Sequence, residues 1–273
     1  MLAGCPCPAF SGVEAVRKWL LITLKSAAEI NKMRWAGRIV AEVLEMMRER
    51  VAPGVTTAEL NELAEAVIRK HNAVPSFKGY PPGSGHPFPA SICASVNEEL
   101  VHGIPGPRVL REGDIISIDV GAILNDYHGD AAITLPVGQI SPEAQRLLGV
   151  TEDALYAGIA AARVGNRSGD ISAAIQSYVE SRGYNVVREY TGHGIGREMH
   201  EDPQVPNFGR PGKGVRLRKG MAVALEPMVL AGDICVKVLD DHWTVASCDG
   251  ELTAHFEHTI AIVGDEAEIL TCL

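Results

Sequence analysis

Apolar residues recur at helical spacing in two segments that match each other along the chain. In residues 54–68 and again in residues 165–179, they follow the i, i+3, i+4, i+7, i+8 pattern of one buried helical face, and the two patterns coincide at an offset of 111. We expect both helices to begin at a Ser or Thr N-cap, with a capping box at Thr56 in the first. A further amphipathic helix is predicted from Ser26 to just before Pro53.

Two apolar strands also repeat, and each contains one acidic residue. Residues 110–121 and 217–227 both read Leu-Arg, one charged residue, Gly and then a mostly apolar run, and at an offset of 107 Asp119 coincides with Glu226. Burying a carboxylate is costly unless it is paired or bound to a metal. The repeated acid therefore indicates one charged centre shared by two related parts of the chain, although two unrelated strands could each tolerate an acid at an edge.

The repeats predict two similar α/β halves within one catalytic domain. The halves span about 26–138 and 141–263, are joined near Pro136–Pro142, and lie in a domain of residues 19–273. Residues 1–18 show little periodic pattern, and we interpret them as a disordered extension or an upstream translation artefact. We do not interpret them as a signal peptide, because a signal peptide needs a basic segment and an apolar stretch before its cleavage site. The 273 residues, 46% of them hydrophobic, can bury a large core.

Charge and cysteine usage narrow the function classes. A formal net charge of -9 at pH 7 argues against a nucleic-acid or anionic-membrane surface, and no apolar run approaches the roughly 18 residues that span a bilayer. Cytoplasmic residence is therefore expected. The cysteines show no C-x-x-C pair and no zinc-ribbon spacing, so we expect all six to be reduced thiols: Cys5, Cys7, Cys93, Cys235, Cys248 and Cys272.

A predicted hairpin brings two aspartates together. The strand that contains Asp119 turns at Asn125-Asp126 and returns through Asp130. With a two-residue turn there, position 119 faces 132 and position 121 faces 130, so the two carboxylates lie diagonally on one face, about 5–8 Å apart. Such a pair either shares a proton, as in an aspartic protease, or binds a metal. Neighbouring histidines favour the metal.

Histidines and a further glutamate complete a candidate metal site. His193 and His200 lie in a Gly-rich segment, and their spacing leaves open whether both are ligands or one is an acid–base group. His102 is followed by Gly-Ile, as His193 is, although two turn histidines without chemistry would look the same. Glu257 begins a strongly apolar strand. The resulting ligand set is typical of Mn, Fe, Co or Zn in a two-metal hydrolytic site: Asp119, Asp130, His193, Glu226 and Glu257.

Short segments that contain these residues make the chain resemble the type I methionine aminopeptidases from about Lys25 to its C-terminus. The segments are Asn97-Glu-Glu-Leu-Val-His102-Gly-Ile-Pro, Ile118-Asp119-Val-Gly, His128-Gly-Asp130, Gly192-His193-Gly-Ile-Gly, His200-Glu-Asp-Pro-Gln-Val, Leu225-Glu226-Pro-Met and Phe256-Glu257-His-Thr. The resemblance implies an α+β pita-bread fold with pseudo-two-fold symmetry, a central antiparallel sheet and a dinuclear metal site between the halves. It also implies a metalloexopeptidase that removes the initiator methionine of nascent proteins when the second residue is small.

The resemblance also implies a role for each matching residue. Asp119 would bind one metal ion, His193 and Glu226 the other, and Asp130 and Glu257 would bridge both. Water or hydroxide between the ions would attack the first peptide carbonyl, with Glu226 as proton shuttle, His200 stabilising the oxyanion, and His102 positioning the substrate amide or relaying a proton. The implied substrate contacts are His102, His200, Phe77, Tyr80, Cys93, Met199 and Trp243.

The chain departs from the family pattern around the substrate pocket, which puts the shape of the pocket in question. Phe77 and Met199 stand where Tyr and Phe are usual, Val101 replaces a common Cys, and about nine residues from Pro82 to Ala90 are inserted into a Pro- and Gly-rich loop. Such a loop is either a binding wall or an ordinary surface loop.

Two alternatives to the aminopeptidase reading remain at this stage. An X-Pro aminopeptidase or prolidase shares the five ligands but carries a large extra N-terminal domain, and a non-catalytic module could use the same fold to bind protein or RNA. The expected partners are nascent N-termini, with transient ribosome contact as a further hypothesis. We expect no direct DNA binding, no membrane association and a monomer.

Overall fold

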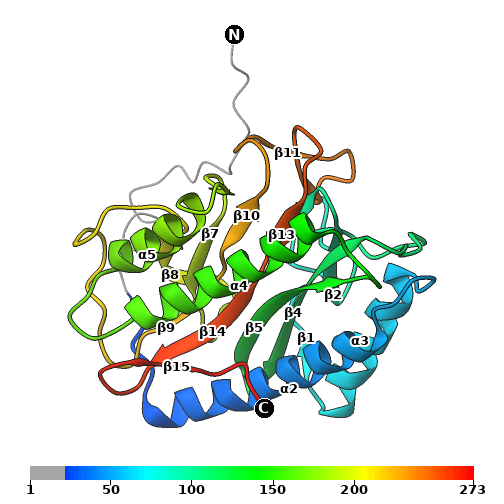
Figure 1. Cartoon of the computed structure of the whole chain (residues 1–273). Helices are drawn as coiled ribbons and strands as arrows, with labels where there is room; N and C mark the ends of the chain where they lie inside the picture. The colour runs from blue at the N-terminus through cyan, green and yellow to red at the C-terminus, as the bar shows by residue number, and fades with distance from the viewer. Residues whose placement is uncertain (1–21) are drawn as a thin grey trace.

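The computed structural model describes residues 22–273 of the chain, and its helices lie on one face of an antiparallel sheet (Figure 1). The helices are α2 (Ala27–Arg50), α3 (Thr57–Lys70), α4 (Pro142–Ala161) and α5 (Ser168–Glu180). Within the described residues, no helix has the length and apolar character needed to cross a bilayer. The expected disorder of residues 1–18 lies outside the described residues.

The predicted central antiparallel sheet is confirmed. Its strand order is β1-β4-β5-β14-β9-β7-β8, with β15 paired to β14 and β2 paired to β4, and two small sheets follow the orders β13-β10-β6 and β11-β12-β3. The strands are β1 (Val74–Pro75), β2 (Ile92–Val96), β3 (Glu99–Val101), β4 (Ile115–Leu124), β5 (Tyr127–Pro136), β6 (Asn185–Val186), β7 (Thr191–Gly194), β8 (Glu201–Pro206), β9 (Ala222–Leu225), β10 (Met228–Leu230), β11 (Val236–Val238), β12 (Val245–Ser247), β13 (Thr253–His255), β14 (Glu257–Ile262) and β15 (Ala267–Ile269).

The helix starts follow the sequence signals at two of three places. Ser26 caps α2, and Thr56 with Glu59 forms the predicted capping box of α3. The expected Ser or Thr cap of α5 is wrong, because Arg167 occupies the N-cap position and its N–H donates to the Asp170 carboxylate at 2.7 Å. The Ser168 hydroxyl is used elsewhere, since it accepts from the N–H of Val215 at 3.0 Å.

The repeated glycines have matching backbone conformations. Gly54 and Gly165 have φ of 95° and 97°, and Gly113 and Gly220 have φ of 94° and 87°. Side chains rarely adopt these left-handed values, which glycine adopts without steric cost. The two segments therefore turn in the same way before α3 and α5, and again before β4 and β9.

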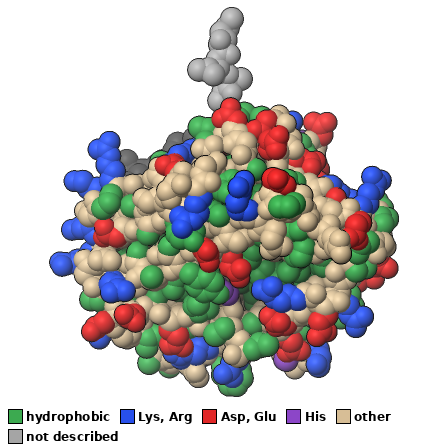
Figure 2. Space-filling model, in the orientation of Figure 1, with side chains coloured by type: hydrophobic (Ala, Val, Ile, Leu, Met, Phe, Trp, Pro, Cys, Tyr) green, Lys and Arg blue, Asp and Glu red, His purple; other side chains and the backbone are tan. Residues whose placement is uncertain are grey.

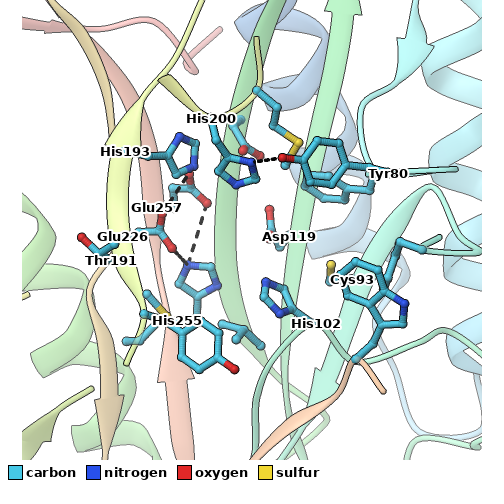
Figure 3. Close-up of a pocket in the computed structure, with 18 residues that line it drawn as sticks. Tyr80, Cys93, His102, Asp119, Thr191, His193, His200, Glu226, His255 and Glu257 are labelled. Carbon is cyan, nitrogen blue, oxygen red and sulfur yellow. Dashed lines mark hydrogen bonds and ion pairs between the residues drawn. The ribbon is translucent and has the colours of Figure 1, made fainter. Parts of the chain in front are cut away.

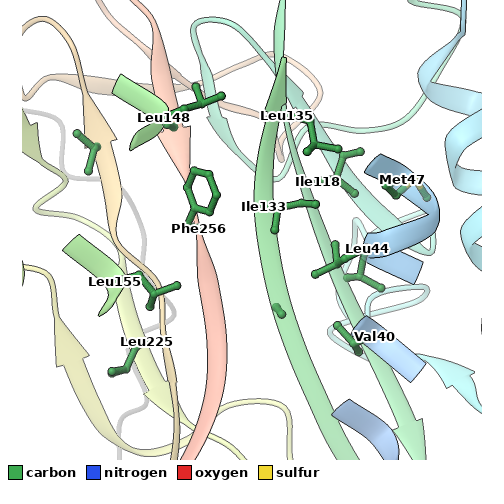
Figure 4. Packing of buried hydrophobic residues seen from close by; sticks show 14 of the residues in the cluster. Val40, Leu44, Met47, Ile118, Ile133, Leu135, Leu148, Leu155, Leu225 and Phe256 are labelled. Atoms are coloured by element: carbon green, nitrogen blue, oxygen red, sulfur yellow. The ribbon is translucent and has the colours of Figure 1, made fainter. Parts of the chain in front are cut away.

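Alternation along the strands separates the apolar core from the polar face. Ile118 of β4 and Ile133 of β5 pack toward α2, and Phe256 packs toward α4 (Figure 4). Because successive side chains of a strand point to opposite faces, Asp119 and Glu257 face away from the helices. Burying the apolar side chains on one face thus fixes which acids are presented on the other.

Both ends of the described chain are tied to distant segments. The N–H of Lys25 donates to the carbonyl of Gly220 at 2.7 Å, and its Nζ lies 2.6 Å from the Glu201 carboxylate. At the other end, Gly37 of α2 packs so closely on the Leu270 carbonyl that a Cβ there would overlap it. The first and last described segments are therefore tied to distant parts of the fold.

The expectation that all six cysteines are reduced thiols is wrong for two of them. Cys235 and Cys248 form a disulfide across the β11–β12 hairpin, with their Cα atoms 5.4 Å apart. Antiparallel pairing places them opposite each other, a register that a separation of 13 residues does not reveal in the sequence. Cys93 and Cys272 are free, and Cys5 and Cys7 lie outside the described residues.

We expect Cys248→Ser to lower the thermal unfolding midpoint. The disulfide closes a short loop and so restricts the unfolded chain, and removing it raises the entropy of the unfolded state. A loop of this size contributes about 3 kcal/mol in the chain-entropy model. Differential scanning calorimetry under oxidising conditions measures the shift, with Cys272→Ser at the exposed free thiol as the matched control. Identical midpoints for both variants and the parent would contradict a stabilising disulfide.

Candidate metal centre

A cavity of about 230 Å³ brings the predicted site residues together (Figure 3). The ligand candidates lie on its β4, β5, β7, β9 and β14 side, and aromatic side chains close the opposite side. The predicted residues that line it are Phe77, Tyr80, Cys93, His102, Asp119, Asp130, His193, Met199, His200, Glu226, Trp243 and Glu257.

Three carboxylates come from three adjacent strands. The predicted register of the β4–β5 hairpin is confirmed, since Asp119 is opposite Ala132 and Gly121 is opposite Asp130. Asn125 and Asp126 form the tight turn, with φ of 51° and 67°. β14 pairs with β5 so that Glu257 is also opposite Ala132. The Asp119, Asp130 and Glu257 side chains therefore converge on one face of the sheet.

The second group comes from β7 and the end of β9. His193 pairs with Ala224 of β9, and Glu226 follows that strand directly. The Nε2 of His193 lies 3.5 Å from Glu226 Oε1. Its Nδ1 lies 2.9 Å from the Gly194 carbonyl, and a proton donated there leaves a lone pair on Nε2. One ligand atom each from Asp130, His193 and Glu257 lie within 4.8 Å of one another.

The electrostatics of this cluster are unfavourable without a cation. Burial raises the pKa of Asp119 to about 7. It also raises the pKa values of Asp130, Glu226 and Glu257 well above their usual range, and the neighbouring carboxylates raise them further. Burial, with His200 nearby, lowers the pKa of His193 to about 3, so this imidazole is neutral and forms no true ion pair with Glu226.

Unpaired buried oxygens support the same interpretation. Asp119 Oδ1, Asp130 Oδ1 and Glu257 Oε1 are buried and have no hydrogen-bond partner among the described residues. Unpaired buried polar atoms are rare in proteins and are costly in free energy. Carboxylate oxygens and one neutral imidazole suit divalent cations such as Mn, Fe, Co or Zn. The residues present therefore fit a metal centre.

We expect the metal-free protein to lose stability as the pH rises from about 6.5 to 7.5, through the pKa of Asp119 at about 7. A carboxyl whose pKa is raised on folding stabilises the fold fully below its unfolded pKa, and that contribution is lost as the pH rises through the folded pKa. The pKa of Asp119 moves from 3.8 to about 7, and the pKa values of its buried acidic neighbours are also raised well above their usual range. The buried histidines have lowered pKa values, so their effect on stability has the opposite sign: stability rises with pH as they titrate. Above about pH 6.5 they are neutral in both the folded and the unfolded state, and they no longer change the stability with pH.

Unfolding midpoints measured in chelator across that pH range test this expectation. The metal-loaded protein is the control, because metal binding requires deprotonated ligands and should reverse the slope. A midpoint of the metal-free protein that rises with pH in this window would contradict the expectation.

Two further histidines face the cavity from either side of the carboxylates. The Nδ1 of His200 lies 2.6 Å from the Tyr80 hydroxyl. Burial raises the pKa of Tyr80, so the phenol stays protonated and can donate to Nδ1, which leaves Nε2–H of His200 as a donor. His102 adopts a left-handed φ of 60°, and burial lowers its pKa to about 4. Both imidazoles are therefore neutral hydrogen-bonding groups near pH 7.

The apolar wall contains a residue that the sequence analysis missed. Phe88, at the end of the inserted segment, is buried edge-on against Phe77 and Trp243 with ring centroids 6.5 and 5.1 Å away. The indole N–H of Trp243 donates to the carbonyl of His86 at 3.1 Å. The inserted segment thus forms part of the pocket wall. The sequence signal that could have revealed Phe88 as a pocket residue is a single aromatic side chain within a stretch rich in Pro and Gly.

The sequence analysis missed other cavity residues as well, including Tyr190, Thr191, Met228 and His255. His255 could have been noticed from strand alternation, because it lies two residues before Glu257 and so faces the same way.

Comparison with known proteins agrees with this site. Residues 31–263 match the model of metallopeptidase family M24. The chain is 57% identical over 252 residues to a methionine aminopeptidase of Clostridium acetobutylicum, covering 92% of this chain and 99% of the relative. The crystal structure of a methionine aminopeptidase from Thermotoga maritima superposes with a TM-score of 0.90 at 47% identity, covering 93% of this chain and 100% of that one.

A prolidase from Pyrococcus furiosus shares the fold, with a TM-score of 0.76 at 21% identity. The match covers 96% of this chain and 68% of the prolidase chain. The predicted pita-bread fold is therefore confirmed, and the identities favour the aminopeptidases over the prolidases. The chain belongs to metallopeptidase family M24, among its type I methionine aminopeptidases.

Proposed function

We propose that this protein removes the initiator methionine from nascent polypeptides whose second residue is small. The observation that carries the proposal is one cavity in which a carboxylate-rich cluster faces an apolar aromatic wall. The cluster can hold divalent ions beside a peptide bond, and the wall can hold an unbranched thioether side chain. The names of relatives more than half identical to the chain support the same activity.

We propose that the cluster binds two ions, drawn from Mn, Fe, Co and Zn. Asp119 would hold one, His193 and Glu226 the other, and Asp130 and Glu257 would bridge them. Such ions, when bound, lower the pKa of a coordinated water toward 7 and polarise the scissile carbonyl.

The protein's own residues would orient the peptide and move protons. Glu226 is only 13% exposed and lies beside His193, so its carboxylate, ionised when metal is bound, can take up a proton from the attacking water and return it to the leaving amine. The Nε2–H of His200 would donate to the developing oxyanion. His102, across the cavity, would hold the substrate amide. The free α-amino group would bind at the metal cluster, which limits cleavage to the first residue.

We expect peptides that begin Met-Ala, Met-Gly or Met-Ser to be cleaved, and Met-Leu, Met-Lys or Met-Phe barely at all. The apolar wall discriminates the first residue by only about 1–3 kcal/mol per methylene. The second side chain would lie close to His102 and His200, where a large group has little room.

Measuring kcat/KM for Met-Ala-Ser, Met-Leu-Ser and Ala-Pro peptides tests the proposal. Equal values for the first two would mean that the segment 82–90 has opened the second subsite. Preference for Ala-Pro would instead favour an X-Pro peptidase, and no turnover with metal bound would favour a binding module.

We also propose that the enzyme acts as a monomer in the cytoplasm, where nascent N-termini emerge, with transient contact to the ribosome. The net charge of -9 speaks against direct DNA binding.

A further inference from the structure

A third imidazole lies against the carboxylate cluster and has no role in the function proposed above. His255 lines the cavity and is 2% exposed. Its Nε2 is buried without a hydrogen-bond partner among the described residues, 4.0 Å from Glu226 Oε2 and 3.8 Å from Glu257 Oε2. Figure 3 shows the ring below both carboxylates, on the side opposite His193.

The backbone of His255 is held by hydrogen bonds on two sides, which fixes the point from which its ring reaches the carboxylates. The Thr134 hydroxyl accepts from the N–H of His255 at 2.9 Å and donates to its carbonyl at 2.8 Å. The Ser117 hydroxyl lies 2.9 Å from the same Thr134 oxygen. On the other side, β13 pairs with β10 so that His255 is opposite Met228. A side chain that projects from a backbone held this firmly is suited to orienting its neighbours.

The two nearby carboxylates determine which tautomer fits. A neutral imidazole that presents a lone pair to two carboxylate oxygens is repelled by both, whereas an N–H in the same place attracts both. Both separations exceed a hydrogen bond, so a modest movement of the carboxylates toward Nε2 would complete the contacts.

We propose that His255 is a positioning residue whose Nε2–H holds the carboxylates of Glu226 and Glu257 in their metal-binding orientation. The inference rests on the ligand set proposed above. Its readout is metal affinity, which does not depend on which peptide is cleaved.

The test compares three substitutions at this position by titrating Mn²⁺ into metal-free protein in a calorimeter. His255→Gln keeps an N–H donor of similar reach, His255→Leu removes it, and His255→Asn keeps a polar group that is too short. His258→Leu is the matched control, because this imidazole of β14 bonds Thr271 in a groove beside α2 and α4, away from the cavity.

We expect His255→Leu and His255→Asn to bind Mn²⁺ about 10–100-fold more weakly, the usual loss for an outer partner of a metal ligand. His255→Gln and His258→Leu should stay within a few-fold of the parent. If the Leu variant does not fold, the Asn variant gives the same comparison. The Co²⁺ absorption spectrum should keep its band positions in the Gln variant, because no ligand is exchanged.

Unchanged affinity in the Leu and Asn variants would overturn the proposal. A shifted Co²⁺ spectrum in the Gln variant would also overturn it, since His255 would then be a direct ligand. Failure of the parent protein to bind Mn²⁺ would instead refute the metal centre itself.

Discussion

Replacing Glu257 by Ala should abolish both metal binding and peptide hydrolysis. Glu257 converges with Asp130 and His193, and its carboxylate is buried with one oxygen unpaired. Loss of a bridging ligand should weaken metal affinity by more than the ~10–100-fold that follows loss of an outer partner. Activity should fall with it, because water activation and carbonyl polarisation both depend on the bound ions.

Calorimetric Mn²⁺ titration together with Met-Ala-Ser turnover measures both effects. Glu268→Ala is the matched control, since that glutamate lies on the adjacent strand β15 and pairs with Arg34 far from the cavity. Retained turnover in Glu257→Ala after exhaustive dialysis against a chelator would eliminate the two-metal proposal.

Replacing His200 by Ala should leave metal binding intact and reduce kcat by about 10²–10³, the usual cost of losing one oxyanion-stabilising donor. The Nδ1 of His200 is occupied by the Tyr80 hydroxyl, so this imidazole presents an N–H rather than a lone pair to the cavity. The chemistry therefore loses a hydrogen-bond donor while the ligand set is kept.

Tyr80→Phe tests the hydrogen bond that orients His200 separately from the His200 imidazole itself. This variant keeps the imidazole and removes only the bond that orients it, so it should lose much less than His200→Ala. Metal loss in His200→Ala equal to that in Glu257→Ala would show that His200 is a ligand and that its assignment is wrong.

The parts of the site that follow from local periodicity could be predicted from the sequence. The positions of Asp119 and Asp130 depend only on a two-residue turn and on strand alternation, and the observed register agrees with both. The apolar stripes likewise predicted α2, α3 and α5, whereas α4 was not predicted from the sequence. The repeat also identified Glu226 as a counterpart of Asp119, and both line the same cavity.

The parts that depend on distant pairings could not be predicted. Strand alternation alone places His255 on the same face as Glu257, but the contacts that hold its backbone there, to Met228 of β10 and to Thr134, 121 residues away, depend on the fold. The Cys235–Cys248 pairing depends on the β11–β12 register, and the burial of Phe88 depends on Trp243. Spacing along the chain carries no information about such contacts.

The anchoring of both chain ends limits how this molecule can move. Lys25 is held to Gly220 and Glu201, and Gly37 packs against Leu270, so each end of the described residues 22–273 is tied to a distant segment. A hinge that opened the sheet like a book would have to break these contacts together. The segments 77–91 and 235–248 meet through the bond from Trp243 to the His86 carbonyl, and they supply Phe77, Tyr80, Phe88 and Trp243 to the cavity wall. None of the five candidate ligands lies in these two segments, so substitutions there would change substrate specificity without changing the ligand set.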